Sequence, residues 1–207
     1  MHFLVAGSYP HIARFVRGDL PRVASRKRVF DALVQHAHLE EDLARLIVGP
    51  GSHLKLMVID RGPGRHGYYP GIGDAIQVAV IIARQYEALM EMAPAPGRRP
   101  RAWQLLTHEA NAMLEAIILH QVVNWGAARA GHVAKKKSLM RPQSEPGDEF
   151  ETQAYGSTMS RIPISGWMGW SYVEDGDSMI ATPYDEQPGY PPAMPSFEVP
   201  PDPDGAG

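Results

Sequence analysis

The chain has 207 residues, a formal net charge of -3 and no cysteine, and these properties exclude several classes of protein. The length suits one domain with a sizeable hydrophobic core and makes a second full domain improbable. The small negative charge argues against nucleic acid as a partner, because phosphate binding needs a concentrated basic surface. The absence of cysteine excludes disulfides, thiolate metal sites and cysteine nucleophiles.

The sequence shows no targeting segment and no membrane-spanning segment. Residues 1–6 form an apolar run far shorter than the core of a signal peptide. No stretch approaches the roughly 20 apolar residues of a membrane helix. A chain without cysteine is typical of the cytoplasm and equally of a protein delivered by a secretion machine. We therefore expect any export to be independent of a signal peptide.

The first part of the chain predicts helices followed by short strands. Residues 1–21 mix apolar residues with glycine and proline, which favours a short strand or loop. Residues 25–48 repeat apolar side chains at helical spacing, which predicts one or two helices. Strands are predicted at 54–60 and 75–82, and we expect them to pair as a hairpin or meander.

The most pronounced helical pattern covers residues 102–124. A short helical turn is expected before it, at 86–92, and Gly126 is expected to end it. At about 100° per residue, several side chains share one continuous face. These residues are Glu109, Met113, Ala116, Ile117, His120 and Asn124. The predicted fold class is therefore α+β, with a long helix packed against a small mixed or antiparallel sheet.

The last part of the chain is aromatic and then rich in proline. Residues 135–148 are predicted to form a polar loop, and 150–156 the next ordered piece. Trp167 and Trp170 are expected to cap the core. Residues 184–207 are dominated by proline, glycine and acids, which predicts an extended or disordered tail. We therefore predict one domain over 1–183 and a tail over 184–207.

The long helix contains His120-Gln121-Val122-Val123-Asn124, which has the outline of the zinc-protease motif His-Glu-x-x-His. In that motif two histidines on one helical face hold zinc, and the glutamate activates the metal-bound water. Gln121 stands at the general-base position and Asn124 at the second ligand position. A neutral amide cannot take a proton from water, and its oxygen is a poor donor for zinc. We expect the shape of the site to persist while zinc binding and turnover fail.

Two segments resemble the metallopeptidase toxin domains of bacterial polymorphic toxins and type VI secretion effectors. Residues 115–126 follow that family's pattern of a leucine and then His-Glu-x-x-His-Trp-Gly, with the two changes described. Residues 150–156, Phe-Glu-Thr-Gln-Ala-Tyr-Gly, match its later Phe-Glu-x-x-Ala-Tyr-Gly box. The turn at 67–70 looks like the family's approach to the active-site helix. The resemblance spans residues 54–156.

The resemblance implies a zincin-like fold with a zinc site. It makes His120 the first zinc ligand, Asn124 the altered position of the second ligand, and Glu151 the third. It gives Gln121 the altered general-base position, and it places Tyr155 near enough to be considered for stabilising a tetrahedral oxyanion. Zinc is the cofactor of the family, and we expect it to bind weakly or not at all here.

The resemblance also implies a biological setting. The target would be a protein or peptide in a recipient cell, and partners would include an immunity protein and a secretion spike. Delivery would proceed from the cytoplasm through a contractile secretion system. No nucleic-acid partner and no membrane span are expected.

Three functions remain open at this point. The first is a metallopeptidase-like effector that is inactive as written, either through natural drift or through deliberate inactivation. The second is a binding module that kept the fold, which predicts that the amides of Gln121 and Asn124 are hydrogen-bonded to protein groups. The third is a structural or cargo component of a contractile injection particle.

The other histidines lack the spacing of metal ligands. No partner at that spacing exists for His11, His53, His66 or His132. The sequence is compatible with a surface position for each of these four histidines. His108-Glu109 begins like the zinc-protease motif, but alanine stands where the second ligand would be needed. We therefore interpret that similarity as coincidence.

Overall fold

The computed structural model describes residues 2–3, 7–50, 52–60, 66–92, 101–132, 145–159, 170–175 and 178–183. For 2–3, 101–106, 170–175 and 178–183 it describes the backbone alone. The helices are α1 (Pro10–Gly18), the 3-10 helix η1 (Leu20–Ser25), α2 (Lys27–Ala37), α3 (Glu41–Val48), α4 (Val80–Met92), α5 (Arg101–Arg129) and α6 (Pro146–Tyr155). The strands are β1 (His2–Phe3), β2 (Lys55–Ile59), β3 (Gly67–Tyr68), β4 (Ala75–Ala79), β5 (Trp170–Asp175) and β6 (Ser178–Pro183).

The first four strands form one mixed sheet in the order β1-β2-β4-β3. Strand β2 pairs in parallel with both β1 and β4, whereas β3 runs antiparallel to β4. The predicted hairpin between the two longer strands is therefore wrong. Both strands carry buried apolar residues, such as Leu56 and Ile76, and such residues suit either direction of pairing.

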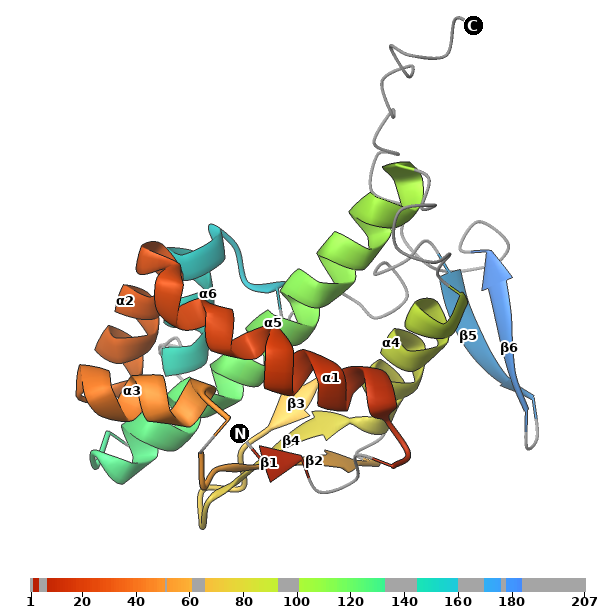
Figure 1. The fold of residues 1–207 in the computed structure, drawn as a ribbon. Coiled ribbons are helices and arrows are strands. Elements are labelled where there is room, and N and C mark those ends of the chain that lie inside the picture. Colours follow the sequence, from red (N-terminus) through yellow and green to blue (C-terminus); the bar gives the residue numbers. More distant parts are fainter. Residues whose placement is uncertain are drawn as a thin grey trace, which may run out of the picture.

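Helix α5 crosses the middle of the molecule and contacts β3, β4, α2, α4 and α6 (Figure 1). Because it has neighbours on several sides, its central part is buried almost all round, and Leu114, Ile118 and Val122 have no exposed surface. A long helix packed on a small mixed sheet confirms the predicted α+β class. No described helix is long and apolar enough to cross a bilayer.

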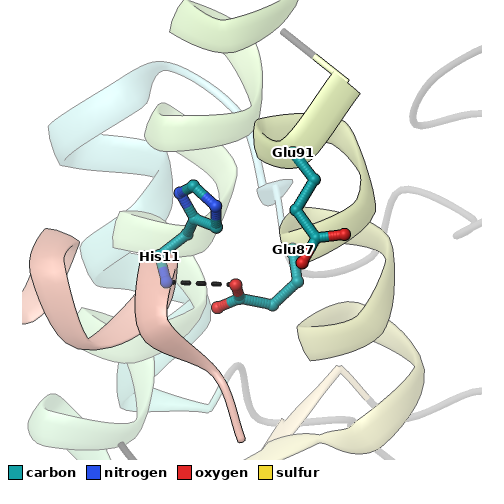
Figure 2. A group of neighbouring side chains, drawn as sticks. All are labelled: His11, Glu87 and Glu91. Carbon is teal, nitrogen blue, oxygen red and sulfur yellow. Dashed lines mark hydrogen bonds between the residues drawn. The ribbon is translucent and has the colours of Figure 1, made fainter. Parts of the chain in front are cut away.

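Helix α1 lies where a strand or loop was predicted. Its first residue is Pro10, a favourable first helical position, but no side chain of its own caps it. Glu87 of α4 does this instead, since its carboxylate accepts a hydrogen bond from the backbone N–H of His11 at 3.0 Å (Figure 2) and another from that of Ile12 at 2.8 Å. A cap supplied from a distant helix leaves no local signal in the sequence.

Other boundaries differ in smaller ways. The expectation of one or two helices over 25–48 is confirmed as two, α2 and α3. Helix α4 begins at Val80, inside the segment predicted as a strand, so the predicted short turn at 86–92 is the second half of a longer helix. Helix α6 begins at Pro146, inside the predicted polar loop.

The C-terminal strands β5 and β6 pair with each other in antiparallel register. Trp167 and residues 184–207 lie outside the described residues, as does the side chain of Trp170. The domain boundary at 183 and the role of these tryptophans therefore stay predictions.

Helix α5 continues through Gly126 to Arg129, so the expected helix end at Gly126 is wrong. A Cβ atom at this position would lie 2.5 Å from the backbone oxygen of Ala37 and 2.8 Å from its Cβ. Glycine is needed here because the end of α2 approaches the backbone of α5 too closely for any side chain.

Replacing Gly126→Ala is expected to lower the free energy of unfolding by about 1–3 kcal/mol, because the added methyl group meets a backbone oxygen that cannot rotate away. Urea unfolding of the variant and the unchanged chain measures this difference in the free energy of unfolding. Gly18→Ala in α1 is the matched control, since no atom lies within 4 Å of its new Cβ. The control is expected to keep or slightly raise the stability. Equal stability of the two variants would contradict the close approach of α2 and α5.

Candidate functional site

His120 of α5 and Glu151 of α6 converge inside the protein. The distance between His120 Nδ1 and Glu151 Oε1 is 2.6 Å, and the exposed fractions of the two residues are 5% and 0%. A buried carboxylate needs such a partner, because an unpaired charge in the interior is strongly destabilising. The structure thus brings together the two groups on which the predicted zinc site depends.

The carboxylates around His120 control its charge. Burial alone lowers the pKa of this imidazole, but Glu145 and Glu151 outweigh that effect and raise the pKa to about 9. Glu145 Oε2 lies 3.8 Å from His120 Nε2, on the opposite side of the ring from Glu151. The imidazole is therefore protonated at neutral pH when no metal is bound, and metal binding must release a proton.

At the predicted second ligand position, both polar groups of the Asn124 amide are hydrogen-bonded to protein groups. Its Nδ2 donates to Glu145 Oε1 at 3.1 Å, and its Oδ1 accepts from the backbone N–H of Gly147 at 3.2 Å. Gly147 is in the first turn of α6, where backbone N–H groups have no partner within the helix. Asn124 thus ties the start of α6 to α5.

Gln121, at the predicted general-base position, lies beside the edge strand β3. It is 5% exposed, and a Cβ atom on Gly67 would lie 3.0 Å from its Nε2 and 3.1 Å from its Cγ. Gly67, the first residue of the segment at 67–70, therefore adjoins α5. Glycine at 67 leaves room for a side chain of this length at 121.

Tyr155 uses its hydroxyl within the protein. The hydroxyl donates to Glu115 Oε1 at 2.8 Å, and Glu115 also forms an ion pair with Arg26. Burial and the charge of Glu115 raise the pKa of this phenol far above its usual range. An oxyanion would have to compete with a carboxylate for this proton. The oxyanion role of Tyr155 stays a prediction.

Sequence reasoning missed three residues near His120. The sequence was compatible with a surface position for His66, but this residue is only 7% exposed. Its Nδ1 has no hydrogen-bond partner in the described part of the chain. Burial lowers the pKa of His66, while the nearby charge of Glu151 raises it. Glu145 directly precedes α6 and Asp148 lies in its first turn. Their ligand atoms and one of His120 all lie within 4.8 Å of one another. The run Glu-Pro-Gly-Asp at 145–148 is typical of a helix start and was a usable signal.

The side chains around His120 suit a divalent cation. An imidazole and two carboxylates are donors that zinc accepts. The backbone of Gly147 lies against the ring, since a Cβ atom there would be 2.5 Å from His120 Cδ2 and Nε2. This contact fixes the plane of the imidazole. The site thus offers a fixed nitrogen donor with carboxylates at both of its ring nitrogens.

A second group with ligand spacing occurs among the described residues, formed by His11, Glu87 and Glu91 where α1 meets α4 (Figure 2). Both oxygens of Glu87 already hold the first turn of α1. The position of Glu87 in this group is therefore explained by its role in capping α1.

A family model described as Metallopeptidase toxin 3 matches residues 5–156. The match runs from before α1 to the end of α6 and includes both sequence boxes. No curated protein and no solved structure matches the chain significantly.

Proposed function

The chain belongs to the metallopeptidase toxin 3 family, and we propose that it is a zinc-peptidase-type effector domain with an impaired catalytic centre. One observation carries the proposal. His120 and Glu151 are retained and paired in the interior, while the neighbouring general-base position holds the neutral amide of Gln121. We also propose that the fold is zincin-like, with α5 as the active-site helix.

The residues of the site explain why the geometry of the metal-binding imidazole would be kept while catalytic turnover would be lost. Zinc in such a site acidifies water and polarises the carbonyl group of the scissile bond. Glu151 orients the imidazole of His120 through Nδ1, which preserves the nitrogen geometry. Gln121 has no basic lone pair and cannot take up a proton. General-base catalysis typically contributes about 100- to 10,000-fold, so the amide accounts for a severe loss of turnover.

Membership of a toxin family supports a biological setting for this domain. Its target would be a protein or peptide in another cell. An immunity protein would protect the producing cell, and a secretion-spike protein would carry the domain through a contractile secretion system. These partners are part of the proposal.

A second candidate is a non-catalytic binding module, such as a cargo or component of a contractile secretion system. The hydrogen bonds of Asn124 favour it, because both polar groups of the amide are used to hold α6. A residue with a structural role of this kind is what a module that no longer binds metal would need.

Growth inhibition separates the two candidates. A chain with Gln121→Glu and Asn124→His, produced in a bacterial host, is expected to arrest growth and to contain zinc, whereas the unchanged chain is not expected to arrest growth. The same restored chain with His120→Ala is the control and should be harmless. A restored chain that folds, contains no zinc and has no effect on growth would contradict the peptidase proposal and favour the binding module.

A further inference from the structure

We propose that a divalent metal ion, with zinc preferred, binds this chain through His120, Glu145 and Asp148 instead of through positions 124 and 151. The inference rests on the proposed function in one respect, because zinc is taken as the metal of the family. It concerns the ligand set of the chain as written, in which the second histidine of the motif is absent.

The two nitrogens of His120 face different partners, and only one of them suits a metal. Nδ1 is 2.6 Å from Glu151 Oε1, a short charge-assisted hydrogen bond to a fully buried carboxylate. Histidines that bind metals usually donate one ring N–H to such a carboxylate and bind the metal through the other nitrogen. This arrangement assigns Nε2 to the metal and makes Glu151 a positioning residue.

Glu145 lies on the Nε2 side of the ring, and Asp148 completes the same group of ligand atoms. Glu145 Oε2 is 3.8 Å from Nε2, and the ligand atoms of the three residues are all within 4.8 Å of one another. Donors that share a tetrahedral zinc ion are about 3.3 Å apart, given bonds of roughly 2.0–2.1 Å. A modest inward movement of the carboxylates would therefore complete the site. The side chain of Glu145 is 55% exposed, which leaves it room to move.

Two features of the structure hold this site in place. The backbone of Gly147 lies against the His120 ring where a Cβ atom would collide with it, which fixes the direction of Nε2. Asn124 Nδ2 donates to Glu145 Oε1, and Asn124 Oδ1 accepts from the N–H of Gly147. The residue at the lost ligand position therefore positions a carboxylate that can replace it.

A rival ligand set would use the Nδ1 side of the ring. It would combine Glu151 with His66, whose pKa feels the charge of Glu151 and whose buried Nδ1 has no partner within the described residues. A metal there would require His120 to give up its hydrogen bond to Glu151. His66 thus reports on the rival site, because it has no part in the proposed one.

Zinc affinity, measured by competition with a chromophoric chelator, tests the ligand set. The Kd of the unchanged chain is expected to rise at least roughly tenfold in Glu145→Gln and in Asp148→Asn, each made separately. Cobalt bound in place of zinc should lose its visible absorption in the same two variants. Glu149→Gln is the matched control, with the same charge change on the same helix and a side chain that is 52% exposed. Glu149→Gln and His66→Gln are expected to shift the Kd by less than about twofold.

The inference is overturned if Glu145→Gln and Asp148→Asn bind zinc as the unchanged chain does, or if folded His66→Gln loses zinc. It is also overturned if the unchanged chain binds no zinc. In that last case, zinc binding and hydrolysis by the Gln121→Glu, Asn124→His chain would leave the proposed function intact. If the restored chain also binds no zinc, both the inference and the proposed function fail.

Discussion

Adding Gln121→Glu to a chain that already carries Asn124→His is expected to raise its rate of protein hydrolysis by about 100- to 10,000-fold. The carboxylate supplies the base that the amide cannot provide, at a position beside the edge strand β3. Asn124→His supplies an imidazole one helical turn from His120, on the same face of α5. Hydrolysis of fluorescein-labelled casein at saturating zinc gives the rates.

The single changes are expected to show that both positions are needed for hydrolysis. Gln121→Glu alone keeps Asn124, so we expect it to remain slow for lack of the second imidazole ligand. Gln121→Asp in the Asn124→His chain is the matched control, because it adds the same charge on a side chain one carbon shorter. That control should recover little of the gain, since a small misplacement of a catalytic group is costly. Equal rates for the aspartate and glutamate variants would refute a general base at 121.

Restoring histidine at 124 has a structural cost. Asn124 accepts a hydrogen bond from the N–H of Gly147, in the first turn of α6. Loss of such a cap typically costs about 1 kcal/mol. Lower stability of the restored chain is therefore expected to accompany its higher activity.

The free energy of unfolding of the metal-free chain is expected to fall by about 3 kcal/mol as the pH rises from 6.5 to 9, because each unit of pKa shift corresponds to about 1.4 kcal/mol. The pKa of His120 is 6.5 in the unfolded chain and about 9 in the folded one. The folded state therefore binds the proton more tightly. This stabilisation is complete below pH 6.5 and is lost as the pH rises through 9.

Urea unfolding in EDTA across this range measures the slope. His108→Gln, a change at an exposed position on α5, is the control and should keep the fall in unfolding free energy between pH 6.5 and 9. His120→Gln should abolish this fall. The pKa values of His38 and His66 are lowered by burial, so their contributions to stability have the opposite sign and are lost as the pH falls below the window. A flat profile for the unchanged chain would mean that His120 is not held between two carboxylates.

A local sequence pattern predicted the helix that carries the site, and the resemblance to metallopeptidase toxins implied the pair at its centre. The spacing of His120, Gln121 and Asn124 depends only on the geometry of one helix, so it can be read directly from the chain. The pairing of His120 with Glu151 was implied by two boxes in a fixed order, and the structure places these residues in contact. The α+β class followed from helical and strand patterns of ordinary length.

Contacts between distant segments determined the rest of the site. The amide of Asn124 is a structural link because α6 places Glu145 and Gly147 beside it, 21 and 23 residues further along the chain. Burial of His66, the parallel pairing of β2 with β4 and the passage of α5 through Gly126 also depend on neighbours that no local pattern specifies. A residue type limits which bonds a side chain can form, and only packing in three dimensions selects the partner.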